Sequence, residues 1–184
     1  MIDSTVIQEL LLYFARFVPV ETRKEIFKQP VASRLPGYEE LRAEILALPE
    51  TQAFREIDSF VLSINDKFVS ERVRNSKKHL LFIEYGHINI TKPGGIIYND
   101  IALTLSVACS LSEANTDMLT EALKMQRNLE IIKIILADMK NQNDICPATK
   151  YLDFPADLMP LDPSLFFGHA GWVATFKRQK TILA

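Results

Sequence analysis

The chain has 184 residues, of which 48% are hydrophobic and 24% charged, and its formal net charge is -2. Such a composition is typical of one folded domain with a substantial core and excludes an intrinsically disordered chain. A net charge this close to zero provides no general attraction to nucleic acid or to an acidic membrane. No apolar run reaches the roughly 20 residues of a membrane-spanning helix, and the first apolar run has no basic segment before it, so we expect neither a membrane span nor a secretory signal. The chain has two cysteines, and because Cys109 is expected to be a buried free thiol, a reducing, cytoplasmic compartment is favoured.

Residues 1–65 are predicted to form a helical N-terminal region. Apolar residues recur at helical spacing from Val6 to Phe17, and two shorter helices are expected between residues 20 and 48. A fourth helix is expected to begin near Pro49, which suits a first helical turn. Strand remains an alternative for part of this last segment, the run FVLSIN. The inward face of the fourth helix would comprise Phe54, Ile57, Val61 and Ile64.

A mixed region, residues 79–184, is predicted to follow a polar, charged segment that ends at Lys78. The run from His79 to Ile90 is apolar and aromatic, as in a strand, with a bend or bulge at Gly86. A second strand is predicted over residues 98–109, because the residues from Ile101 to Cys109 alternate between large apolar and small side chains, with the period of two that strands have. The turn sequence Lys92-Pro93-Gly94-Gly95 between the two runs predicts an antiparallel hairpin.

A long amphipathic helix is predicted over residues 116–140, because the period of the apolar residues changes from two to about 3.6. Its inward face would comprise Met118, Ala122, Met125, Leu129, Ile132, Leu136 and Met139. A proline-rich stretch from Cys146 to Gly171 indicates extended chain at the surface or along a sheet edge, and alternation from Gly171 to Arg178 predicts a closing strand. The predicted fold class is therefore α+β: an antiparallel sheet packed against a long amphipathic helix, with a helical N-terminal region.

The residue types that usually hold metals or act as nucleophiles are sparse. His79, His87 and His169 have no second ligand at metal-binding spacing, so we predict no metal and no other cofactor. Cys109 falls on the apolar face of a strand, where a buried free thiol is expected, and Cys146 lies in the proline-rich stretch without an assignable base.

Two carboxylates interrupt strands that are otherwise built for burial. If the hairpin forms, Glu84 and Asp100 could lie on one sheet and carry out acid/base or metal chemistry, which is one alternative function. The structural alternative is that Asp100 accepts hydrogen bonds at a strand end, whereas Glu84 pairs with a base such as Lys177.

A short basic cluster supports a third interpretation. Arg72, Arg74, Lys77 and Lys78 lie close together beside the turn signal Asn75-Ser76. They could contact phosphates in a small regulatory or nucleic-acid-binding module, although a solvated loop is the commoner role of such a cluster.

The order of hairpin, strand IALTLSVACSL, long helix, proline-rich segment and terminal strand GWVATFKR resembles the tail-terminator and tail-completion proteins of long-tailed phages and prophages. The resemblance covers residues 79–180, and its most suggestive pieces are YNDIALTLSVA and LDPSLFFGHAGWVATF. It implies a non-enzymatic subunit, cytoplasmic or in a virion, that forms a homo-oligomeric ring and contacts other tail proteins. The helical N-terminal region departs from the short single helix usual in that family.

Assembly requires apolar patches and complementary edges, and it does not require a membrane, a nucleic acid or a small-molecule substrate. Aromatic residues and exposed turns are the natural candidates for such contacts. The cluster Leu165-Phe166-Phe167 is equally compatible with a place in the core. The candidate interface residues are Lys92, Gly94, Gly95, Leu165, Phe166, Phe167 and Trp172.

Overall fold

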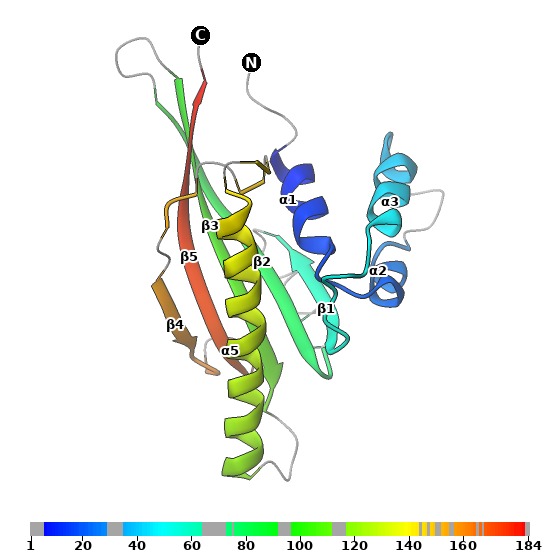
Figure 1. Ribbon diagram of the computed structural model, residues 1–184, viewed down its shortest axis with the longest axis vertical. Coiled ribbons are helices and arrows are strands. Elements are labelled where there is room, and N and C mark those ends of the chain that lie inside the picture. Colours follow the sequence, from blue (N-terminus) through cyan, green and yellow to red (C-terminus); the bar gives the residue numbers. More distant parts are fainter. Residues whose placement is uncertain are drawn as a thin grey trace.

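The computed structural model describes residues 6–28, 35–63, 73–74, 76–91, 97–111, 117–143, 145–146, 148–149, 152–154, 157–164, 166 and 168–182. These residues form an α+β fold in which helices pack on a five-stranded sheet (Figure 1). The helices are α1 (Val6–Ala15), α2 (Val20–Ile26), α3 (Tyr38–Ala47) and α5 (Met118–Asn141). The strands are β1 (Ile57–Leu62), β2 (His79–Thr91), β3 (Ile97–Ser110), β4 (Asp157–Leu161) and β5 (His169–Ile182). No helix in the described part of the chain combines the length and hydrophobicity needed to cross a bilayer.

The sheet order is β1-β2-β3-β5-β4, and every pair of neighbours except one is antiparallel. The predicted hairpin is confirmed as β2 and β3, with an irregularity in their register between Tyr85 and Ile88, beside the predicted bulge at Gly86. The closing strand is confirmed as β5, which lies between β3 and the edge strand β4. β4 contains Pro160, in agreement with the extended edge predicted from the prolines.

The predicted fourth helix of the N-terminal region is wrong. Its inward-facing residues from Ile57 to Val61 belong to strand β1, which pairs in parallel with β2. The register shifts between Ile57 and Ser59, so that Ile57 and Phe60 both join the core on one side of the sheet. This irregularity gives the strand an apolar spacing that resembles a helix, and the strand alternative for FVLSIN was the correct one.

The predicted long helix is confirmed as α5, but its expected inward face is wrong at the start. The residues of α5 that are buried are Asn128, Ile131, Ile132, Ile135 and Met139. Met118 is 84% exposed, because the first turns of α5 extend past the end of the sheet (Figure 1). The helix is thus longer than the surface it covers.

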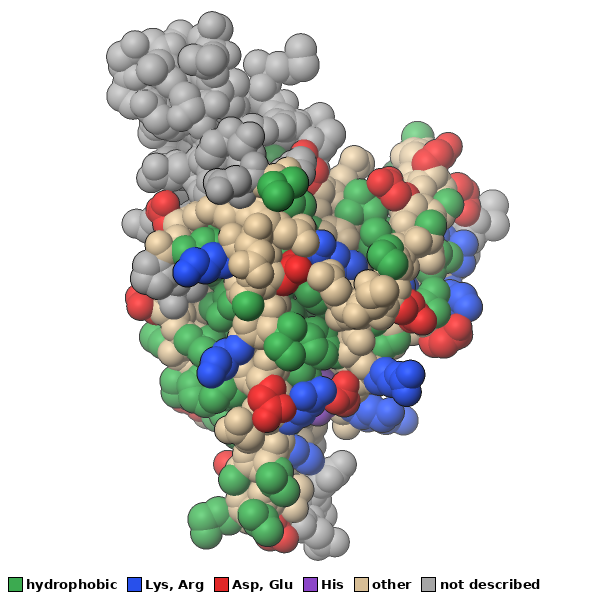
Figure 2. Space-filling model, in the orientation of Figure 1, with side chains coloured by type: hydrophobic (Ala, Val, Ile, Leu, Met, Phe, Trp, Pro, Cys, Tyr) green, Lys and Arg blue, Asp and Glu red, His purple; other side chains and the backbone are tan. Residues whose placement is uncertain are grey.

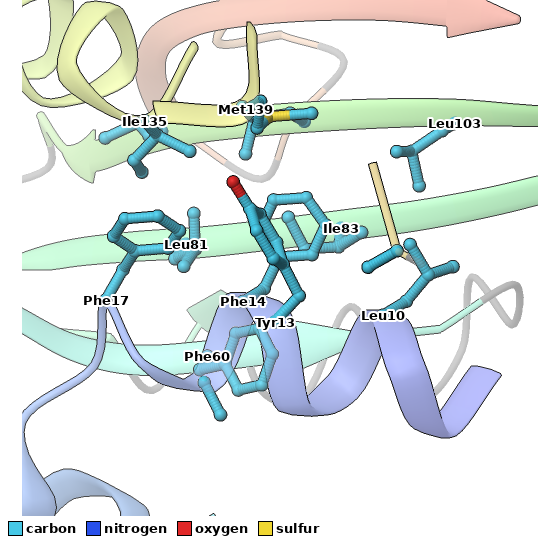
Figure 3. Close-up of a cluster of buried hydrophobic side chains, with 14 of the residues drawn as sticks. Leu10, Tyr13, Phe14, Phe17, Phe60, Leu81, Ile83, Leu103, Ile135 and Met139 are labelled. Carbon is cyan, nitrogen blue, oxygen red and sulfur yellow. The ribbon is translucent and has the colours of Figure 1, made fainter. Parts of the chain in front are cut away.

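The main core lies between the sheet and the two helices α1 and α5 (Figure 3). Successive residues of β2 alternate between its two faces: Leu81 and Ile83 join this core, whereas Leu80 and Phe82 join a smaller cluster behind the sheet. Leu10, Phe14 and Phe17 of the α1 segment meet Ile135 and Met139 of α5 in the same main core. The N-terminal region and the sheet therefore bury apolar surface together.

Asp138 on α5 is the polar link between these helices. Its carboxylate accepts hydrogen bonds from Tyr13 Oη at 2.7 Å, from Gln52 Nε2 at 2.8 Å and from Arg16 Nη2, with which it also forms an ion pair. The Arg16 guanidinium stacks over the Tyr13 ring, 3.9 Å from its centroid. Burial and the bond to Asp138 raise the pKa of Tyr13, so that its hydroxyl stays protonated and donates.

Replacing Asp138 by Asn should lower the free energy of unfolding by about 1.5–3 kcal/mol, because charged hydrogen bonds with little exposure are lost. The matched control is Glu130→Gln on the same helix, which breaks an exposed ion pair with Arg127 and should cost about 0.5 kcal/mol or less. Urea denaturation of both variants measures the difference, and equal losses would show that Asp138 is not a structural link.

Gly171 on β5 lies very close to the backbone of β3. It pairs with Ala108 of β3, and a Cβ atom at position 171 would lie 2.0 Å from the carbonyl oxygen of Val107 and 2.6 Å from Ala108 Cα. Both contacts are with backbone, which cannot turn aside as a flexible side chain can.

Gly171→Ala should therefore lower stability by about 1–3 kcal/mol or more, as overpacking does. Thr175→Ala, an exposed position on the same strand, is the control and should change stability by less than about 0.5 kcal/mol. Thermal denaturation compares the two, and a Gly171→Ala variant as stable as the control would contradict the close approach.

Candidate functional site

A cavity of about 520 Å³ lies where β2 begins and β3 ends, beside α5. We call it the basic pocket, because four of the seven described residues that line it are Lys or Arg. Figure 2 shows Lys and Arg side chains gathered beside the lower half of α5. The residues that line the basic pocket are Arg55, Glu56, Lys77, Lys78, His79, Cys109 and Lys124.

A polar network forms on the sheet side of the basic pocket. His79 and Cys109 are paired residues on β2 and β3, and Asn128 of α5 lies against both. The Asn128 amide nitrogen donates to Cys109 Sγ at 3.2 Å and to the Ala170 carbonyl at 3.1 Å. Its amide oxygen, 2.7 Å from His79 Nδ1, can only accept, so Nδ1 carries the proton of the neutral imidazole.

The carboxylate in the lining already has a cationic partner. Arg127 donates to Glu56 Oε1 from Nε at 3.0 Å and from Nη2 at 2.6 Å. Partial burial acts to raise the pKa of Glu56, but hydrogen bonds from its own backbone and from Arg127 outweigh burial and hold that pKa below its usual value. Glu56 is therefore ionised at neutral pH and pairs with Arg127, which also forms an ion pair with Glu130.

The cationic side chains that line the basic pocket differ in their bonding partners. Lys124 donates from Nζ to the Ser110 carbonyl at 3.3 Å. Among the described residues, none bonds to the charged groups of Arg55, Lys77 or Lys78. The nearby carboxylate Asp58 accepts instead from the backbone N–H groups of Lys77 and Lys78, at 2.9 and 3.0 Å. These bonds hold the segment in place and leave the lysine ammonium groups exposed.

The second candidate surface is the projecting start of α5. Three large apolar side chains are open to solvent there: Met118 is 84% exposed, Leu119 70% and Leu123 62%. Figure 2 shows hydrophobic side chains gathered on this projection. We call these three residues the α5 tip. Asp117 is the N-cap of α5, because its Oδ1 accepts from the Thr120 N–H at 2.7 Å.

Two of the predicted interface aromatics contact the body of the protein itself. Phe166 is partly buried against the cluster behind the sheet, with its ring 5.6 Å from that of Phe82. Trp172 is partly buried in the main core, and its Nε1 donates to the Met125 carbonyl of α5 at 3.1 Å. The other predicted interface residues, Lys92, Gly94, Gly95, Leu165 and Phe167, lie outside the described residues.

The strand register does not bring the two predicted carboxylates together. Glu84 pairs with Thr104, which is four residues from Asp100 along β3, a distance of about 13 Å at strand spacing. The expected partner Lys177 pairs with Ala102, whereas the β5 residue in line with Glu84 is Thr175.

The predicted basic cluster is divided. Lys77 and Lys78 line the basic pocket, Arg74 is exposed outside the lining, and Arg72 lies outside the described residues. Within the described residues, no group of three or more His, Cys, Asp or Glu is arranged to hold a metal ion.

Three described lining residues of the basic pocket were not predicted from the sequence: Arg55, Glu56 and Lys124. They come from segments far apart in the chain, as does Asn128, which contacts His79 and Cys109 of the lining, and none belongs to a recognisable motif. One feature of the sequence could have indicated the polar network: Asn128 is the one polar residue on the buried face of α5. It can be recognised only when it is known which side of the helix faces the sheet.

Comparison of the chain with models of protein families, with curated proteins and with solved structures finds no match. The fold class of this protein is α+β. Proposals about its function must therefore be argued from the basic pocket and from the start of α5.

The polar network makes a prediction about the tautomer of His79. In the neutral imidazole, ¹⁵N chemical shifts of the ring should show a proton on Nδ1 and a bare Nε2. In the Asn128→Leu variant this preference should disappear, and stability should fall by about 1–3 kcal/mol because the Ala170 carbonyl and Cys109 lose their donor. An Nε2-protonated ring in the unaltered protein would contradict the network.

Proposed function

We propose that this protein is a non-enzymatic assembly subunit, which associates with further copies of itself and with other proteins through the α5 tip. The observation that carries the proposal is the exposure of Met118, Leu119 and Leu123 on one projecting helix end. Contiguous apolar patches on a folded surface mark sites of association, whereas isolated ones need no explanation. Coverage of the α5 tip by another chain would remove this surface from water.

The shape of the fold supports contact between unlike surfaces. The α5 tip extends from one end of the molecule, and β2, β3 and β5 extend past the helices at the opposite end (Figure 1). Subunits that contact one another through two different surfaces form rings when the rotation between them closes. The strands β1 and β4 are the outer strands of the described sheet, and outer strands can pair with the backbone of another chain. On β1, the Ile57 carbonyl already accepts from Thr22 Oγ1.

A ring subunit of the phage tail-terminator type is the specific form of this proposal, in agreement with the resemblance over residues 79–180. Its partners would be identical subunits and other tail proteins. The separation of Glu84 from Asp100 along the register favours this function over the alternative of an enzyme that uses these two carboxylates.

The proposal predicts an oligomer that depends on the α5 tip. We expect sedimentation velocity across a wide range of concentration to show a discrete oligomer for the unaltered protein. The double variant Leu119→Glu/Leu123→Glu should shift it towards the monomer, because two charges would have to enter the contact. Glutamate is a good helix former, so the helix itself should persist.

The matched control is Ile134→Glu, at a position on the same helix that is 52% exposed and outside the α5 tip. This variant should assemble like the unaltered protein. A monomer at every concentration would contradict self-assembly, and unchanged assembly of the double variant would remove the α5 tip from the interface.

A further inference from the structure

We propose that the basic pocket binds a small molecule that carries one or more phosphate groups. The proposal is independent of assembly, because the basic pocket and the α5 tip share no residue. A volume of about 520 Å³ lies within the range of about 300–1,000 Å³ found for small-molecule sites.

The positively charged side chains of the lining favour an anionic ligand. Arg55, Lys77, Lys78 and Lys124 all line the one cavity, and Glu56, the only carboxylate among the described lining residues, is paired with Arg127. A cleft lined by charges of one sign concentrates the field within it and attracts ions of the opposite sign. This local excess of positive charge is notable in a chain whose net charge is -2.

Three of the cations are available to a ligand. The head groups of Arg55, Lys77 and Lys78 have no bonding partner within the described residues. Lysine binds phosphate as a compact charge, and arginine can donate two parallel hydrogen bonds to it. A phosphate group can form an ion pair with lysine and accept two hydrogen bonds from arginine.

The rest of the lining favours a compact ligand over a nucleic-acid strand. Among the described lining residues, only His79 has a ring, and its Nδ1 is held by Asn128. Proteins that bind single strands usually stack successive bases on aromatic side chains, and the described lining provides no series of such rings. With Nδ1 held, His79 Nε2 can accept from a protonated phosphate oxygen or, once protonated, donate to an ionised one.

Isothermal titration calorimetry of the full chain with pyrophosphate tests the proposal. We expect saturable binding that weakens as salt rises, and at least a tenfold loss of affinity in the variant Lys77→Gln/Lys78→Gln, whose backbone bonds to Asp58 remain possible. The control Lys133→Gln replaces an exposed lysine of α5 outside the lining and should bind like the unaltered protein.

A second measurement locates the ligand without relying on a variant. Titration with pyrophosphate should shift the NMR signals of the His79 ring and of the Asn128 side-chain amide, and leave those of Gln52 unchanged. The proposal is overturned by no saturable binding, by equal affinity in the lysine double variant, or by shifts that avoid His79. It is also overturned if mixed-sequence single-stranded DNA binds and pyrophosphate does not.

Discussion

The attachment of α5 to the sheet is the constraint on which the rest of the structure depends. Ile131, Ile132 and Ile135 bury one side of the helix in the main core, and Asp138 fixes its far end to α1 through Tyr13 and Arg16. Because a packed core does not allow a helix to slide, the phase and position of α5 are set by these contacts. The two candidate surfaces then follow: Asn128 lies against His79 and Cys109, and the first turns of α5 extend past the sheet.

Much of the fold could be predicted because its longest elements have regular apolar periods. The alternation from Ile101 to Cys109 and the helical spacing up to Met139 predicted β3 and α5, and the turn sequence between the two runs predicted the hairpin. β1 was predicted as a helix because its irregular register places Ile57 and Phe60, three residues apart as on a helix face, on the same side of the sheet, and because parallel pairing with β2 joins segments without a local turn signal. Non-local pairing leaves little trace in a single sequence.

The candidate sites were harder to predict than the fold. Apolar residues at helical spacing are normally buried, so the exposure of Met118 could not be inferred without the length of the sheet beside it. Lys77 and Lys78 were identified as a basic cluster, but their relation to Arg55 and Lys124 depends on how β1, β2 and α5 pack. Trp172 looked suitable for an interface because aromatic residues are common there, yet its indole nitrogen has a partner within the chain, at the Met125 carbonyl.

The central claim is that α5 is held rigidly over the sheet while its exposed start is left for another chain to cover. Hydrogen exchange of the full-length protein, followed as its concentration is raised, tests this claim most directly. The account predicts that the amides of residues 118–125 become more protected with concentration, while those of residues 131–139 are strongly protected throughout. Protection of residues 118–125 that stays constant while the protein associates, or weak protection of residues 131–139, would contradict it.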